Sequence, residues 1–291
     1  MMDRELRLRH IAVRDKRILL GGSLVVLAIV VSVFAPLLSP YDPIEIFSGL
    51  RNAPPGTPGH VLGTDQTGRD IVSRLVWGCR ITLAMGSVPV LAAMIVGTVL
   101  GMTAAYFGGW FGWLVLRLME VLFAFPLVLL AILAAQVLGK GMFNAMAAMA
   151  IVVVPYVSRA AYAATRSTMT LTFVEAAKVR GAGPWLVLWS EVLPNIFASL
   201  VVFAVSVMPI FIIFSAGLSY LGLAIEPPTP EWGIMIAEGQ KVIQVAPHVP
   251  TIPGLFLLLL SVSLNILGDG LQDVLDPRSA RAGASQGGGL E

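Results

Sequence analysis

The chain has 291 residues, of which 57% are hydrophobic and 12% are charged, and its mean hydropathy is +0.85. A soluble domain carries about a quarter charged residues, so this composition excludes an ordinary soluble protein and places the chain in a bilayer. The single cysteine, Cys79, excludes an intramolecular disulfide, and the net charge of +2 indicates little about partners.

The first apolar run, residues 18–38, is long enough to cross a membrane, because about 20 apolar residues span the hydrocarbon. A cleaved signal peptide is the alternative, but its apolar core is usually about 7 to 15 residues long. The segment Phe34-Ala35-Pro36 is also a poor cleavage site. We therefore expect an uncleaved span that follows a cytoplasmic tail, residues 1–17.

Residues 39–79 are polar and rich in proline and glycine, which predicts an extended or looped segment. Its last part, residues 71–77, has the pattern of a short capped helix lying on the membrane surface. We expect residues 18–80 to form the first transmembrane helix and an extracytoplasmic loop.

Five further apolar runs predict spans at residues 81–106, 113–138, 145–162, 196–223 and 252–271. Gly97 and Gly101 give the second span a small face that allows close helix packing. Pro126 predicts a kink in the third span, and residues 226–250 read as a proline-rich hydrophilic loop. Residues 81–278 would form the core domain, and residues 279–291 a disordered tail.

The most polar segment between two late spans is residues 172–194. Residues 173–180 predict a short helix on which Phe173, Ala176 and Ala177 share one face, which Arg180 would extend. Gly181 would end this helix, and Gly183-Pro184 would turn the chain. A small-faced helix rimmed by charges and held between two spans would fit a groove on a soluble partner.

Basic residues are distributed unequally between the two sides of this topology. If the N-terminus is cytoplasmic, thirteen Lys and Arg residues lie inside and six lie outside, as the positive-inside rule requires. Those inside are Arg4, Arg7, Arg9, Arg14, Lys16, Arg17, Arg117, Arg159, Arg166, Lys178, Arg180, Arg278 and Arg281. Those outside are Arg51, Arg69, Arg74, Arg80, Lys140 and Lys241. Both termini and residues 172–194 are therefore expected in the cytoplasm.

The residues of an intramembrane enzyme are missing from the predicted spans. The three histidines, His10, His60 and His248, all lie outside them, so no buried Ser-His pair can form. The sequence contains no His-Glu-x-x-His motif and no phosphate-binding Gly-x-x-x-x-Gly-Lys-Ser/Thr loop. We expect no catalytic residue, metal or cofactor on this chain and no nucleic-acid partner, and any ATP must bind to another chain.

An ion-coupled secondary transporter is the alternative function. Such carriers place ionisable groups near the membrane midplane, whereas the charged candidates here are few. Arg117 and Glu120 are three residues apart in the third span and predict an ion pair. The ion-coupled alternative stays open at this point.

Residues 175–194 resemble the Glu-Ala-Ala signature of the membrane subunits of ABC importers. The matching residues are Glu175-Ala176-Ala177, then Gly181, then Leu193-Pro194. Glu191 departs from the general pattern, which has an aliphatic residue two positions before the Leu. Four more stretches resemble the C-type subunit of the dipeptide, oligopeptide and nickel permease family. They are residues 60–70 with 73–75, residues 106–110 with 123–126, residues 218–223 with 227–233, and residues 265–278.

This resemblance implies an all-α integral membrane protein with six transmembrane helices, the type I ABC importer permease fold. It implies four kinds of partner besides the lipid bilayer: a homologous B-type permease subunit, two cytoplasmic ATPase subunits that carry ATP and Mg, and an extracytoplasmic substrate-binding protein. The ATPase-coupling helix would comprise Phe173, Glu175, Ala176, Ala177, Lys178, Arg180 and Gly181.

The resemblance also suggests an extracytoplasmic contact or gate region that comprises Asp65, Arg69, Asp70, Pro227, Pro228 and Trp232. The cargo is not readable from the sequence, because members of this branch carry dipeptides, oligopeptides, glutathione or nickel chelates. Met142, Met146 and Met149 share helical spacing, but a methionine stripe in a span usually serves packing.

Overall fold

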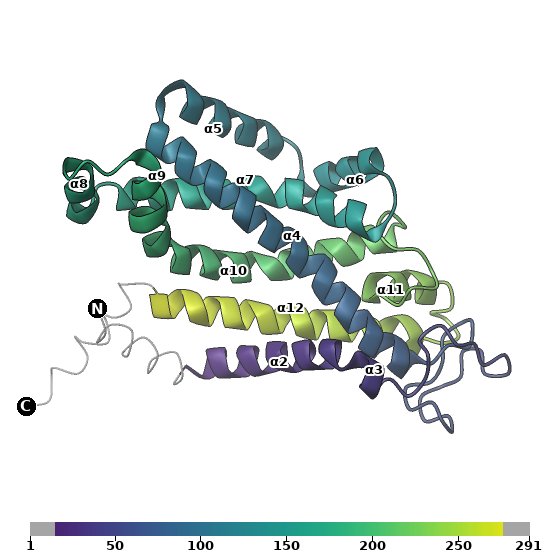
Figure 1. Cartoon of the computed structure of the whole chain (residues 1–291). Helices are drawn as coiled ribbons and strands as arrows, with labels where there is room; N and C mark the ends of the chain where they lie inside the picture. Colours follow the sequence, from purple (N-terminus) through teal and green to yellow (C-terminus); the bar gives the residue numbers. More distant parts are fainter. Residues whose placement is uncertain (1–14, 276–291) are drawn as a thin grey trace, which may run out of the picture.

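The computed structural model describes residues 15–275, and within them the chain is helical without a β-strand (Figure 1). The helices are α2 (Lys16–Val33), α3 (Ala35–Leu38), α4 (Ile71–Phe107), α5 (Gly109–Phe123), α6 (Leu127–Leu138), α7 (Met142–Thr168), α8 (Thr172–Val179), α9 (Pro184–Leu186), the π-helical segment η1 (Val187–Val192), α10 (Leu193–Tyr220), α11 (Trp232–Gln240) and α12 (His248–Leu275).

Five helical stretches are long and apolar enough to cross a membrane: Lys16–Val33, Ile71–Phe107, Met142–Thr168, Pro184–Tyr220 and His248–Val274. The pair α5 and α6 passes the same test jointly but is bent by 97°. The predicted kink at Pro126 is therefore a break between two helices. Proline cannot donate the helical hydrogen bond and disfavours helical backbone in the residue before it, which explains its position.

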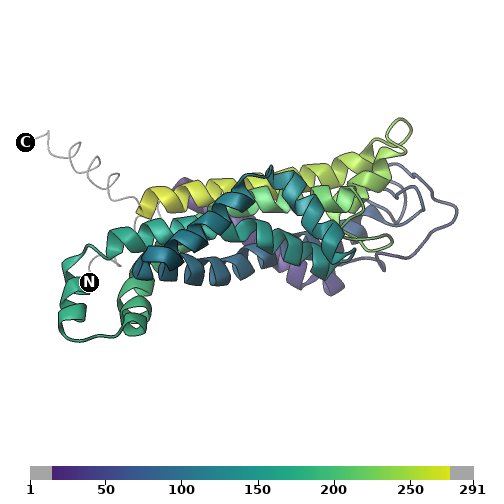
Figure 2. The same ribbon diagram turned by 90° about the horizontal axis from the view of Figure 1, so that it is seen from above.

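The helices run lengthwise in an elongated bundle with two distinct ends (Figures 1 and 2). At one end, which we call the α8 end, the rings of Phe107 and Trp185 lie 6.0 Å apart. At the other, the loop end, Lys140 Nζ lies 3.0 Å from Glu226 Oε1. The bent pair α5–α6 carries the chain from Phe107 at the α8 end to Lys140 at the loop end. We therefore count it as a sixth membrane crossing.

The start of α2 and the last turns of α12 lie at the α8 end (Figure 1). Arg17 and Asp273 form an ion pair there at 2.7 Å, and Gly270 lies against Ile18. The predicted tails, residues 1–17 and 279–291, lie largely outside the described residues. The start of α2, the end of α12 and α8 therefore lie at the same end of the bundle, as six membrane crossings require.

Two sequence predictions about the loop end are wrong. Residues 71–77 do not form a separate surface helix; they are the first two turns of α4, whose N-terminus is capped by Asp70. Ile71, Leu75 and Cys79 are buried, so the apolar face continues without interruption into the span predicted to begin at residue 81. The proposed boundary after residue 80 lies inside this helix.

The predicted hydrophilic loop at residues 226–250 contains a helix, α11, which the sequence reading missed. Trp232, Ile234 and Met235 are buried against α4, α10 and α12. Gly233 and Gly239 permit this close packing, because a Cβ atom would lie 2.2 Å from Ala216 O and 2.7 Å from Pro250 N. α11 is therefore wedged between the spans at the loop end.

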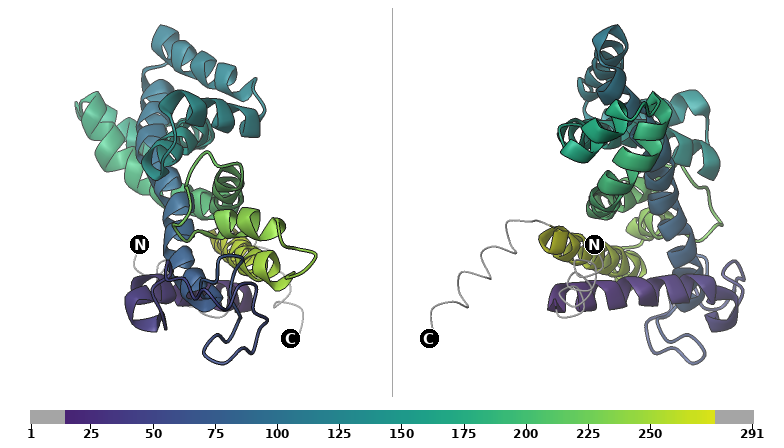
Figure 3. Two further views of the ribbon diagram at one scale, coloured as in Figure 1. Left: turned by 90° about the vertical axis from the view of Figure 1, so that its right-hand side faces the viewer. Right: turned by 60° about the vertical axis from the view of Figure 1, so that its left-hand side comes forward.

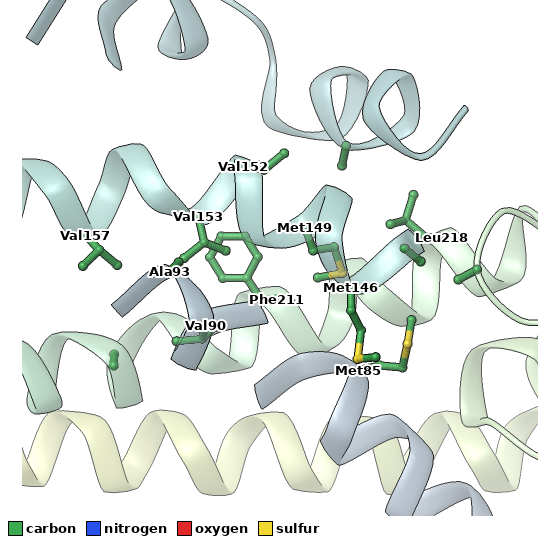
Figure 4. Packing of buried hydrophobic residues seen from close by; sticks show 14 of the residues in the cluster. Met85, Val90, Ala93, Met146, Met149, Val152, Val153, Val157, Phe211 and Leu218 are labelled. Carbon is green, nitrogen blue, oxygen red and sulfur yellow. The ribbon is translucent and has the colours of Figure 1, made fainter. Parts of the chain in front are cut away.

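The contact between α4 and α7 is the most extensive in the bundle. As predicted, Gly97 and Gly101 face the other helix, and a Cβ on Gly101 would lie 2.3 Å from Ser158 O. Nearer the loop end, Met85, Val90, Met149 and Val153 pack with Phe211 of α10 in the largest apolar cluster (Figure 4). The views in Figure 3 place α2 on one side of α4 and the α5–α6 pair on the other.

Replacing Gly101 with Ala should destabilise the bundle, because the added methyl meets a backbone carbonyl that cannot move alone. Overpacking of this kind costs about 1–3 kcal/mol. Gly254→Ala in α12 is the matched control, since nothing lies within 4 Å of its Cβ position. Thermal unfolding in detergent should show a lower midpoint for Gly101→Ala and an unchanged or higher one for Gly254→Ala; equal midpoints would contradict the close approach.

Candidate functional site

The candidate coupling helix is α8, the short helix beyond the end of α7. Its end carries two overlapping hydrogen bonds, from Gly181 N to Lys178 O at 2.9 Å and from Ala182 N to Ala177 O at 3.1 Å. This is the Schellman pattern, and it requires a left-handed residue at Gly181, whose φ is +84°. The prediction that Gly181 ends the helix is confirmed.

One side of α8 is anchored to the bundle. Val174 and Ala177 are buried in a cluster with Met102, Val187 and Leu188, and Phe173 packs at its edge. Lys178 Nζ lies 5.5 Å from the centroid of the Tyr106 ring, a further contact between α8 and α4. These contacts fix which side of α8 remains free.

The free side of α8, which we call the outward face, comprises Thr172, Glu175, Ala176 and Val179, all exposed. Val179 is 87% exposed, although it is apolar. The prediction that Ala176 shares a face with Phe173 and Ala177 is therefore wrong: the larger Val174 takes the inward position. Arg180, the C-cap residue, is exposed as well.

The segment after α8 contains the other half of the sequence signature. Pro184 starts α9, and the π-helical segment η1 precedes Pro194, with Leu193 N bonded to Leu188 O. The wider π-turn suits this place, because Pro194 lacks a donor and its ring clashes with a regular helical carbonyl. Trp185, Leu186 and Trp189 are exposed apolar side chains on this segment.

The predicted extracytoplasmic residues gather at the loop end in a buried charge network. Asp65 accepts hydrogen bonds from Arg69 Nε at 2.6 Å and from Arg74 Nη1 at 2.5 Å. Glu238 of α11 accepts from both arginines, at 2.9 and 3.0 Å. Burial would raise the pKa of Asp65, but the Arg74 charge and hydrogen bonds from Arg69 and Thr67 outweigh it and lower that pKa.

A second set of buried polar contacts fixes the starts of α4 and α11. Asp70 accepts from Ser73 N at 2.7 Å and lies 2.9 Å from His60 Nδ1. Trp232 Nε1 donates to Leu75 O at 3.0 Å. Glu231 caps α11 by accepting from Ile234 N at 3.0 Å, and its burial raises its pKa.

These positions separate the six predicted outer residues into two groups. Asp65, Arg69, Asp70 and Trp232 are buried, so they can shape an outer surface but do not present their side chains on it. Pro227 and Pro228, joined by a cis peptide bond, are exposed. The structure does not bring them into the charge network; their role in a contact or gate stays a prediction.

Sequence reasoning missed Glu238 and Glu231 as members of these networks. Glu238 is 164 residues from Arg74, and Glu231 is 149 residues from its partner Thr82. No local spacing can indicate such pairs. Among the described residues no group of His, Cys, Asp and Glu could hold a metal ion.

Glu238→Gln should loosen the loop end, because it leaves the Arg74 guanidinium, which is 1% exposed, with one carboxylate instead of two. Breaking a buried ion pair costs about 3–5 kcal/mol, and the part exposure of Glu238 places this case near the lower bound. The matched control is Lys140→Gln, which breaks the exposed Lys140–Glu226 pair and should change little. Limited proteolysis within residues 39–70 measures the difference; equal cleavage rates would contradict a clamping role.

Known proteins similar to this chain are membrane transport components. Residues 97–281 match the family of binding-protein-dependent transport system inner membrane components. Residues 10–55 match the N-terminal transmembrane domain of oligopeptide transport permease C.

Three relatives show how far the similarity extends. The glutathione transport system permease protein GsiD of Pectobacterium atrosepticum is 40% identical over 270 residues, 93% of this chain and 88% of its own length. The di/tripeptide transport system permease protein DppC of Pseudomonas aeruginosa is 40% identical over 269 residues, 90% and 89% of the two chains. GsiD of Escherichia coli is 41% identical over 256 residues, 87% and 84%.

Proposed function

The chain belongs to the family of binding-protein-dependent transport system inner membrane components, and from this premise we propose that it imports small peptides or peptide-like solutes with energy from ATP. It is a multi-pass inner-membrane protein and a permease subunit. As such a subunit it would form one part of the translocation pathway, while other chains of the transporter bind ATP and deliver the cargo. None of the three relatives is named as an ion-coupled carrier, so the alternative gains no support.

The observation that carries the proposal is the form of α8. A helix of two turns is held rigidly by a buried inner side and a Schellman end, while its outward face stays exposed. Ala176 keeps that face thin, and Glu175 offers a charge to a basic neighbour. A rigid projection with a small, charged face is suited to transmit movement from a docked ATPase to α7 and α10.

The partners follow from the same proposal. Two cytoplasmic ATPase subunits with ATP and Mg would act at the α8 end, which makes that end and both termini cytoplasmic. A homologous B-type permease subunit would complete the passage in the bilayer. The extracytoplasmic binding protein would meet the loop end, where Pro227 and Pro228 are exposed and the charge network ties Arg69 and Arg74 to Glu238 of α11.

The direct test is uptake into proteoliposomes that contain the chain with its partner permease and ATPase chains and a loaded binding protein. We expect accumulation of glutathione or of a dipeptide that requires ATP, the ATPase chains and the binding protein together. Uptake driven by a proton or sodium gradient without ATP would favour the ion-coupled alternative and overturn the proposal.

Ala176→Trp should uncouple transport without disturbing the membrane domain, because the side chain is exposed and a bulky ring would obstruct docking. We expect ATPase subunits to copurify at least about tenfold less, the effect of roughly 1.4 kcal/mol of lost binding energy. Phe143→Trp, at an exposed position of α7 at the loop end, is the control. Full copurification and uptake with Ala176→Trp would place the docking surface elsewhere.

A further inference from the structure

Arg159 is a charged side chain exposed on a membrane span. It lies on α7, nine residues before Thr168, the last residue of that helix. At 1.5 Å per residue this is about 14 Å from the α8 end of α7. The 27 residues of α7 extend about 40 Å, about 10 Å more than the hydrocarbon of a bilayer. A centred α7 therefore places the Arg159 backbone about 9 Å inside the hydrocarbon, on the side of the α8 end.

The Arg159 side chain does not extend back toward the α8 end. Its guanidinium carbon lies 4.7 Å from the centroid of the Phe123 ring. Phe123 is the last residue of α5, fourteen residues after Gly109, which is about 21 Å along that helix from the α8 end. The Phe123 ring thus holds the guanidinium inside the hydrocarbon. The side chain does not extend to the membrane interface, as the side chain of an arginine in a span usually does.

No carboxylate neutralises Arg159 within residues 15–275, where the ion pairs found are made by other residues. The nearest acidic residue along α5, Glu120, is paired with Arg117 at 2.6 Å, as the sequence predicted. That pair is exposed too, with side chains 62% and 48% accessible. Two adjacent helices therefore carry charges in their membrane-spanning parts.

The exposed residues of α7 between Arg159 and the α8 end form one face, which we call the α7 stripe. It comprises Arg159, Ala163, Arg166 and Ser167, spaced by four, three and one residues. This spacing places them on one side of a helix, as in an amphipathic pattern. Tyr156, three residues before Arg159, extends the stripe toward the loop end, and its ring centroid lies 4.8 Å from that of Phe123.

A lipid-facing position is excluded for this stripe on energetic grounds. An unpaired charge facing hydrocarbon is costly, and ionisable residues in spans almost always face a bundle interior or a water-filled cavity. The α7 stripe must therefore border either water or a group supplied by another chain.

We propose that the α7 stripe lines the water-filled passage and that Arg159 is a binding station for carboxylate groups of the cargo. This inference rests on the proposed import of peptide-like solutes, which carry a C-terminal carboxylate that is charged at pH 7. A guanidinium binds a carboxylate through two parallel hydrogen bonds. Phe123 holds the guanidinium from one side through a cation–π contact that leaves its donors free, and Tyr156 adds apolar surface beside it.

The test uses thiol reagents of opposite charge and needs neither cargo nor ATP. Cys79 is replaced by Ala, and Ala163→Cys places a thiol one helical turn from Arg159 in the complete complex in proteoliposomes. The probes are the anionic sulfonatoethyl and the cationic trimethylammonioethyl methanethiosulfonates, with rates normalised to a free thiol in solution. A unit charge about 6 Å away in water changes the ratio of anion to cation concentration by about tenfold.

We expect both reagents to modify Ala163→Cys, with the anion favoured about tenfold. Arg166 lies three residues from position 163 and would attract the same anion, so it is replaced by Gln in all of these variants. In this background Arg159→Gln should abolish the preference, and Arg159→Lys should keep it. Val26→Cys on α2, in the span with the smallest buried share, should react with neither reagent.

Two results would overturn the proposal. No reaction at Ala163→Cys would mean that a partner chain or lipid covers the stripe, and reaction without charge preference would mean that Arg159 attracts no anion. Failure of ATP-driven uptake in the unmodified complex would instead sink the proposed function and leave these rate ratios unchanged, so the two failures are distinguishable.

Discussion

The close packing of α4 against α7 is the contact on which the other features depend. Gly97 and Gly101 let the two backbones approach, and the long α4 also contacts α2, α5, α10 and α11. α8 follows directly from α7, and the inner side of α8 packs on residues of α4, α7 and η1. The position of α7 therefore sets both the outward face of α8 and the depth at which Arg159 meets Phe123.

The two ends of the bundle are built on different principles. At the α8 end, an apolar anchor and a glycine-dependent helix end leave a small, exposed face, which is what a docking surface needs. At the loop end, Asp65 and Glu238 neutralise two arginines and tie the segment 39–70 to α11. Buried ion pairs add less net stability than their short distances suggest, but losing one partner is severe, so they specify one arrangement of the outer surface.

Local patterns in the sequence were enough to predict where the apolar spans lie, the α8 helix and its end at Gly181, but not the start of α4 at Ile71 or the 97° bend between α5 and α6. Apolar length identifies a span, and glycine followed by Gly-Pro identifies a turn, because each depends on neighbouring residues only. The pairings of Glu238 with Arg74 and of Glu231 with Thr82 could not be predicted, since they join residues about 150 positions apart. The face of α8 was misjudged for Ala176 because alanine fits either side of a helix, whereas the larger Val174 decides which side is buried.

The central claim is that the outward face of α8 contacts an ATPase chain on the cytoplasmic side of the membrane. Site-specific crosslinking from Glu175→Cys in intact cells tests it most directly, with Phe143→Cys at the loop end as reference. The account predicts that the crosslinker joins position 175 to an ATPase subunit, protected from a membrane-impermeant thiol reagent added outside, while position 143 gives no such product. Labelling of position 175 from outside the cytoplasm, or its crosslinking only to extracytoplasmic partners, would contradict the account.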